Sequence, residues 1–138
     1  MYQVVIDTNV LVAAARSRRG TSYALLQTFR SGRWQLNVSS ALLLEYEAQL
    51  KAEALRQGLR MILVDRFLDF LLSRSNRRET FFLLRPFLRD AKDDFIIELA
   101  VASRADYIIT WNIRDFALAL EYGIIVIRPN EFLDMIKT

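Results

Sequence analysis

Short runs of β-branched and aromatic residues alternate along this chain with longer segments that have helical periodicity. Repeated strand–helix units of this kind are typical of a parallel sheet whose strands are connected by helices. The short runs are apolar at nearly every position, as expected for strands that are buried on both faces. We therefore expect a single α/β domain over residues 1–138, with helices on both faces of the sheet.

The expected elements follow from these patterns and from the residues that end them. The expected strands are 3–6, 34–38, 80–84, 107–110 and 124–127, and the expected helices are 9–16, 22–30, 40–56, 61–73, 93–104, 116–121 and 131–136. Gly32, Gly58 and Gly123 fall where helices should end, and Ser39 or Ser40 suits the N-cap of the helix that follows. The polar segment 73–80 is expected to be an exposed turn.

Asp7 is a carboxylate inside the otherwise apolar stretch VVIDTNVLVAA. Burying a carboxylate is costly unless it is paired or binds a cation. Ligands of open α/β sheets bind beyond the carboxyl ends of the strands, and Asp7 directly follows the first expected strand. Thr110 ends the fourth expected strand, and Asn112 and Asp115 follow it, so we expect all of them at one edge. The alternative for Asp7 or Asp115 taken alone is that it caps the next helix.

A second acid, Glu45, lies in the expected helix 40–56. The apolar stripe that the spacing predicts for this helix is Ala41, Leu44, Ala48, Ala52 and Leu55. Glu45 lies at the edge of this stripe, whereas Glu47 and Glu53 are expected in solvent. An inward-facing carboxylate needs a partner, so Glu45 is the acid of this helix that indicates a functional site.

A third group of acids, Asp90, Asp93 and Asp94, precedes or opens the expected helix 93–104. Capping explains each of them taken singly, but three acids exceed what one helix start requires. Asp93 and Asp94 each precede Ile97 by three or four residues, so either can face inward.

The chain contains no cysteine and no histidine. These absences exclude thiol nucleophiles, thiolate metal sites, the Ser-His-Asp triad and the usual zinc sites. If the separate acids come together, their repulsion requires protonation or a cation. Mg²⁺ or Mn²⁺ bound through oxygen is the cofactor that fits this residue set.

All but three of the 19 basic residues are arginine, which favours bidentate contacts to phosphate. The arginines expected near the acidic edge are Arg16, Arg18, Arg19 and Arg114. Trp111 is placed to stack a nucleic-acid base. The alternatives are ordinary solvated arginines and a tryptophan that packs against a neighbouring helix. No apolar stretch has the roughly 20 residues of a membrane span, and no signal peptide is evident, so we expect a cytoplasmic protein.

Four segments, in this order, resemble the PIN-domain family of metal-dependent ribonucleases, and especially its bacterial and archaeal toxins of VapC type. VVIDTNVLVAA is similar to the opening strand with the first acid, Asp7, and SSALLLEYEAQL to the helix with the second acid, Glu45. RDAKDDFIIELAVASRADYIITWNIRDF is similar to the family's long signature of third acid, helix, strand, threonine and final acid. IIVIRPNEFL is similar to the closing strand and helix.

The resemblance implies a three-layer PIN-like fold with a five-stranded parallel sheet of order 3-2-1-4-5. It implies hydrolysis of single-stranded RNA with Mg²⁺ or Mn²⁺, a small antitoxin protein as partner, and self-association as a homodimer or larger homo-oligomer. The implied catalytic residues are Asp7, Glu45, Asp93 and Asp115, the implied metal ligands are Asp7, Asp93, Asp94 and Asp115, and the implied supporting residues are Thr8, Asn9, Asp90, Thr110 and Asn112.

The sequence departs from the family pattern at two places. Asn112 stands where many members have aspartate, which leaves Asp115 as the fourth acid. Counted back from Thr110, Asp93 fits the spacing of one subgroup of the family and Asp94 fits the spacing of another. We favour Asp93 as the third acid. One rival interpretation is a PIN-like interaction domain that has lost catalysis. A second is a receiver-like signalling domain, but that needs an acid pair after the first strand, where Asp7 is single.

Overall fold

The computed structural model describes residues 1–79 and 91–137, and for residues 91–94 it describes the backbone alone. Within these residues, five strands form one parallel sheet in the order β3-β2-β1-β4-β5. The strands are β1 (Tyr2–Ile6), β2 (Trp34–Val38), β3 (Asn76–Arg77), β4 (Tyr107–Ile109) and β5 (Ile125–Ile127). The sheet order implied by the resemblance is therefore confirmed.

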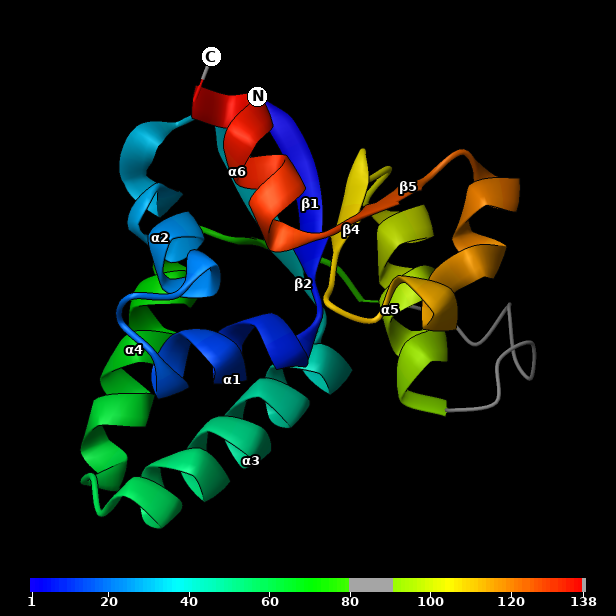
Figure 1. Ribbon diagram of the computed structural model, residues 1–138. Helices are drawn as coiled ribbons and strands as arrows, with labels where there is room; N and C mark the ends of the chain where they lie inside the picture. The colour runs from blue at the N-terminus through cyan, green and yellow to red at the C-terminus, as the bar shows by residue number, and fades with distance from the viewer. Residues whose placement is uncertain (80–90, 138) are drawn as a thin grey trace.

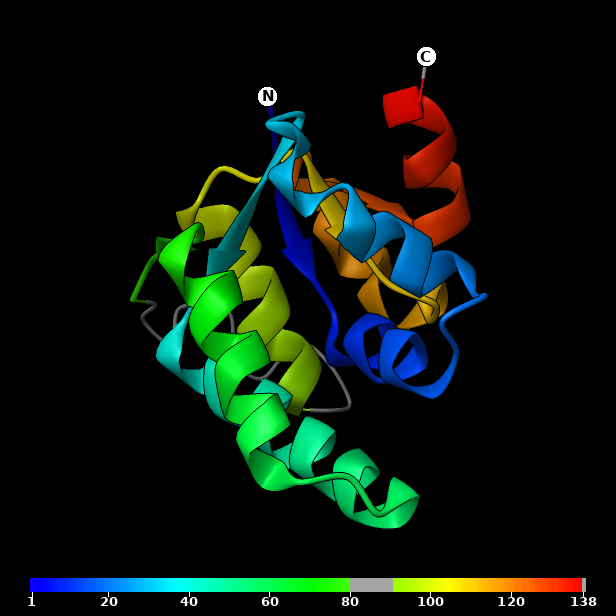
Figure 2. The ribbon, with the colours of Figure 1, turned by 90° about the vertical axis from the view of Figure 1, so that its left-hand side faces the viewer.

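Helices connect the strands and cover both faces of the sheet. They are α1 (Thr8–Arg16), α2 (Thr21–Gln27), α3 (Ser40–Gln57), α4 (Met61–Ser73), α5 (Ala91–Ala102) and α6 (Pro129–Lys137), with 3₁₀ segments η1 (Phe29–Ser31) and η2 (Ile113–Tyr122). α2, α4 and α6 lie on one side of the sheet and α5 and η2 on the other (Figure 1), so the predicted three layers are present. Figures 1 and 2 both show α3 and α4 joined by a turn far from the sheet.

The edge strand β3 was not expected from the sequence. β3 is Asn76–Arg77, inside the segment 73–80 for which an exposed turn was expected, and it pairs in parallel with β2. Both residues of β3 are exposed, which an edge strand tolerates because backbone hydrogen bonds rather than apolar side chains hold it. The predicted strand 80–84 lies outside the described residues.

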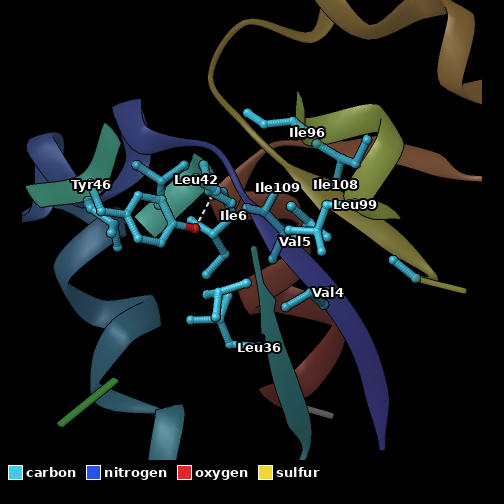
Figure 3. Packing of buried hydrophobic residues seen from close by; sticks show 14 of the residues in the cluster. Val4, Val5, Ile6, Leu36, Leu42, Tyr46, Ile96, Leu99, Ile108 and Ile109 are labelled. Carbon is cyan, nitrogen blue, oxygen red and sulfur yellow. Dashed lines mark hydrogen bonds between the residues drawn. The ribbon is translucent and has the colours of Figure 1, made fainter. Parts of the chain in front are cut away.

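The core is centred on β1, which lies between β2 and β4. Val4, Val5 and Ile6 are fully buried in it. Figure 3 shows side chains from the neighbouring strands and from α5 gathered around them, Leu36, Ile96, Leu99, Ile108 and Ile109 among them. A strand apolar along most of its length has both faces covered, and the central position of β1 is the physical reason that its carboxyl end is enclosed.

The buried face of α3 is not the predicted stripe. Leu42, Tyr46, Leu50 and Ala54 are buried, whereas the side chains of Leu44 and Leu55 are exposed, with relative accessibilities of 66% and 73%. The predicted stripe is therefore wrong. The observed face carries a tyrosine and two leucines, which remove more apolar surface from water than the alanines of the predicted stripe.

Local signals for helix ends agree with the structure. The Ser39 hydroxyl accepts a hydrogen bond from the Leu42 amide at 3.2 Å, so Ser39 rather than Ser40 caps α3. Gly58 ends α3 at φ +73° and Gly123 ends η2 at φ +77°, a backbone conformation that favours glycine. Among the described residues, no helix has the length and apolarity needed to cross a lipid bilayer.

Candidate active site at the carboxyl edge of the sheet

Asp7 and Thr110 lie side by side because β1 and β4 are neighbouring parallel strands. Ile6 pairs with Ile109, and the Asp7 amide donates to the Ile109 carbonyl at 2.9 Å. The Thr110 hydroxyl, which is fully buried, donates to Oδ2 of Asp7 at 2.7 Å. Residues more than a hundred positions apart in the chain are thus joined at the carboxyl ends of the two strands.

The Thr110 hydroxyl oxygen also accepts hydrogen bonds, and so organises the loop after β4. The Asn112 amide donates to it at 3.0 Å, and the Asn9 side chain donates to it at 3.4 Å. The Asn9 side-chain oxygen in turn accepts from the Trp111 amide at 3.4 Å. These bonds link the start of α1 to the start of η2 and hold one oxygen of Asp7 between them.

Asp7, Glu45 and Asp115 line a single pocket of about 480 Å³. They come from the end of β1, from α3 and from the first turn of η2. The other residues that line it are Thr8, Asn9, Val12, Ala13, Arg16, Gln49 and Asn112. Three of the four predicted catalytic acids therefore line the same pocket.

The pKa of Asp7 is raised above its ordinary value, mainly because burial disfavours the charged carboxylate. The negative charges of Glu45 and Asp115 raise it further, while the Thr110 hydroxyl and the Thr8 amide lower it. The pKa of the Tyr46 hydroxyl is also raised, by its burial and then by Asp7 and Glu45. The acids therefore repel one another in a partly desolvated space.

The capping alternative is not realised for Asp7. Asp7 is the N-cap residue of α1, but its side chain makes no capping hydrogen bond. Asp115 lies in the first turn of η2, where its side chain is exposed. Thr8 is buried, and its hydroxyl has no hydrogen-bond partner among the described residues. A buried polar atom of this kind beside a carboxylate leaves a place for a further polar group.

The candidates for the third acid are Asp90, Asp93 and Asp94. Asp90 lies outside the described residues, and the side chains of Asp93 and Asp94, in the first turn of α5, are outside them too. Within the part of the chain that is described, no three acidic residues are close enough together to hold an ion. The donor set that lines the pocket nevertheless consists of carboxylate, amide and hydroxyl oxygens, which are the ligands of hard cations such as Mg²⁺ and Mn²⁺.

The predicted RNA-binding residues do not all lie at the pocket. Arg16 lines it, whereas Arg18 lines a separate apolar cavity between α1 and α4, and Arg19 and Arg114 are exposed elsewhere. Trp111 is half-buried against the core, and its ring nitrogen donates to the Ser22 hydroxyl at 2.9 Å. This geometry favours the packing alternative for Trp111.

Three residues in or near the pocket have structural roles that the sequence did not predict. Gln49 lines the pocket one turn after Glu45, and the Tyr46 hydroxyl donates to the Ile6 carbonyl beside Asp7 (Figure 3). Glu53 was expected in solvent, but its side chain is only 3% exposed, so that expectation is wrong. The spacing of Glu45, Gln49 and Glu53 at every fourth residue is the signal that could have found this face.

Comparisons with known proteins point to one family. A family model described as the PIN domain matches residues 3–114. A search of curated protein sequences finds no significant match. Among solved structures, the chain is similar to a chain in the crystal structure of VapBC2 from Rickettsia felis bound to a DNA fragment from the VapBC2 promoter. The TM-score is 0.62 and the sequence identity is 18%, and the match covers 91% of this chain and 98% of that one. It is also similar to PAE2754 from Pyrobaculum aerophilum, with TM-score 0.59, 16% identity, and coverage of 99% of this chain and 90% of that one. At these identities the two structures support the fold, and the matched family model shows that the chain belongs to the PIN domain family.

Proposed function

We propose that this protein is a ribonuclease that uses Mg²⁺ or Mn²⁺ to hydrolyse phosphodiester bonds of single-stranded RNA. The observation that carries the proposal is Asp7, a half-buried carboxylate whose pKa is raised by burial and by two further acids at the same pocket. Carboxylates that repel one another in this way are relieved by a divalent cation. Membership of the PIN domain family supports the same conclusion.

The chain's own residues divide the work. Asp7, Asp115 and either Asp93 or Asp94 would hold the ion. A divalent ion held by these residues would supply a water of lowered pKa and would offset charge on the leaving oxygen. Thr110 keeps one oxygen of Asp7 in place through its 2.7 Å hydrogen bond. Glu45, on the α3 wall of the pocket, is the residue that accepts the proton of the attacking water or supplies a further ligand.

Partner proteins belong to the same proposal. The similarity to a chain of VapBC2 supports a toxin that pairs with an antitoxin. Apolar side chains exposed around the turn between α3 and α4, namely those of Leu55, Leu59, Ile62 and Leu63, support a protein–protein interface, self-association included.

The test compares RNA cleavage by the purified protein and by its Asp7→Asn variant, with Mn²⁺ and with Mn²⁺ plus chelator. Loss of a ligand carboxylate should lower the cleavage rate by at least about a hundredfold. Asp134→Asn makes the same change at an exposed position of α6 and should cleave like the parent. Equal cleavage by parent and Asp7→Asn contradicts the proposal, and no cleavage by the parent favours a PIN-like interaction domain.

A further inference from the structure

The pocket continues from the acids near the sheet toward the far end of α1. On α1, Asn9 and Arg16 line it two turns apart. On α3, Glu45 and Gln49 line it, and Glu53 follows one turn later. Figure 1 shows α1 and α3 both starting at the end of the sheet and running away from it side by side. The pocket is therefore acidic at the sheet and has an arginine at its other end.

Glu53 is a buried carboxylate with a full set of donors. Its Oε1 accepts from Nε of Arg16 at 2.6 Å, and its Oε2 accepts from Nε of Arg56 at 2.9 Å and from the side-chain amide of Gln57 at 2.8 Å. Gln57 also donates to the Ala15 carbonyl at 3.1 Å. The end of α1 is thus tied to the end of α3, and one carboxylate oxygen is committed to Arg16.

Arg16 is held at one atom and open at the others. Its side chain is 60% exposed and lines the pocket, while its Nε donates to Glu53. Within the part of the chain whose side chains are described, neither Nη atom of Arg16 donates a hydrogen bond. Guanidinium is planar, so fixing Nε restricts the plane of the whole group. The two Nη groups then form a pre-oriented pair of donors of the kind that binds phosphate.

We infer that Glu53 is a positioning residue for RNA: it holds the Arg16 guanidinium at the end of the pocket away from the sheet, where Arg16 contacts a phosphate of the bound strand. The inference rests on the proposed function, because it takes the acidic end of the pocket as the place where the phosphodiester is cleaved. The inference adds Glu53 to the functional residues. Glu53 does not line the pocket itself and acts through Arg16.

If Glu53 has a purely structural role, removing it should change the affinity for RNA in the opposite direction. A carboxylate close to a bound polyanion repels it, so deleting Glu53 should tighten RNA binding if the acid only ties α1 to α3. If Glu53 positions Arg16, deleting it should weaken RNA binding although a negative charge is lost. The direction of the change separates the two roles without reference to stability.

The experiment is a double-mutant cycle on binding of a short fluorescein-labelled single-stranded RNA, followed by fluorescence anisotropy in the presence of chelator. Arg16→Gln should weaken binding about tenfold, as for loss of a charge-assisted contact. It should also reduce the slope of log affinity against log salt by about 0.7, the value for one phosphate contact to a single strand. Glu53→Ala should produce both changes, and the double variant should bind no more weakly than Arg16→Gln alone.

Two further variants serve as controls. Arg56→Gln removes the other arginine of the same carboxylate, which does not line the pocket, and should keep the parent's affinity within about twofold. Glu53→Gln retains an oxygen that accepts from Arg16 and should recover part of the affinity lost in Glu53→Ala. With Mn²⁺ present, Arg16→Gln and Glu53→Ala should raise KM and leave kcat nearly unchanged.

Two results overturn the inference: Glu53→Ala binds RNA as tightly as the parent or tighter, or it weakens binding by the same factor in the Arg16→Gln background. Failure of the proposed function looks different. In that case Mn²⁺ elicits no Asp7-dependent cleavage, while the binding cycle still shows the coupling. Cleavage that depends on Asp7 without any coupling between Arg16 and Glu53 supports the proposed function and refutes the inference.

Discussion

At the scale of single residues, Thr110 is the side chain on which the geometry of the pocket depends most. Its buried hydroxyl donates to Asp7 and accepts from Asn112 and Asn9. Thr110→Val keeps the shape but removes these bonds, so the free energy of unfolding, measured by urea titration, should fall by about 1–3 kcal/mol. In the parent, the hydrogen bond from Thr110 lowers the pKa of Asp7. The pKa of Asp7 should therefore rise in Thr110→Val, and the acidic limb of the pH–rate profile should move to higher pH.

Thr8→Val is the matched control for this prediction. The Thr8 hydroxyl is buried as well, but it has no hydrogen-bond partner within the described residues. Replacing it with a methyl group removes an unsatisfied polar atom, so the metal-free protein should be as stable as the parent or more stable. A loss of stability equal to that of Thr110→Val would show that burial of the threonines, and not the bonds of Thr110, is what matters.

At the scale of elements, the link between α1 and α3 should depend on pH through Glu53. Its pKa is lowered from 4.5 to about 2, first by Arg56, then by Gln57 and Arg16. A lowered pKa of a carboxyl group means that its contribution to stability is complete above pH 4.5 and is lost as the pH falls through about 2. The Tm of the parent should therefore fall more steeply over this range than the Tm of Glu53→Gln.

Arg56→Gln separates the contributions to this acid sensitivity. It removes the largest cause of the lowered pKa, so its Tm should fall with pH at a slope between those of the parent and Glu53→Gln. Identical slopes for all three proteins would show that the ion pairs of Glu53 do not contribute to stability. Differential scanning fluorimetry across the pH range measures the three slopes directly.

The helix α3 also shows where sequence periodicity misleads. Two sets of residues at spacings of three and four can form its apolar face, and periodicity alone does not rank them. Packing against the rest of the protein buries the face with Leu42, Tyr46 and Leu50. In this orientation of α3, Glu53 is buried and Glu45 lines the pocket. The prediction for Glu45 gave a useful position although the stripe used to reach it was wrong, because Glu45 lies next to both candidate faces.

At the scale of the whole molecule, a metal ion that binds the folded protein alone should stabilise it. Mn²⁺ at a hundred times its dissociation constant should raise the free energy of unfolding by about 2.7 kcal/mol. The increase should be largely absent in Asp7→Asn, because the ion loses a central ligand. Thermal unfolding of both proteins across a Mn²⁺ titration measures the effect, and an equal increase in parent and variant would place the ion at another site.

Much of the fold was predictable because four of the five strands, β1, β2, β4 and β5, coincide with apolar runs in the sequence. The five-stranded parallel sheet follows from apolar runs separated by helical segments, and its order followed from the family resemblance. β3 was not predicted because it is short, polar and exposed, and such an edge strand is stabilised by backbone pairing that leaves no trace in residue type.

For the site, the sequence established which chemistry is available and at which strand ends it lies. The absence of cysteine and histidine, and the acids after the first and fourth strands, are properties of the chain itself. Contacts between distant segments decided the rest: Thr110 and Asp7 meet because β4 lies beside β1, and Arg16 meets Glu53 because α1 runs beside α3. Such contacts depend on how helices pack against the sheet, and packing energy depends on all the surrounding side chains at once, so no local pattern encodes it.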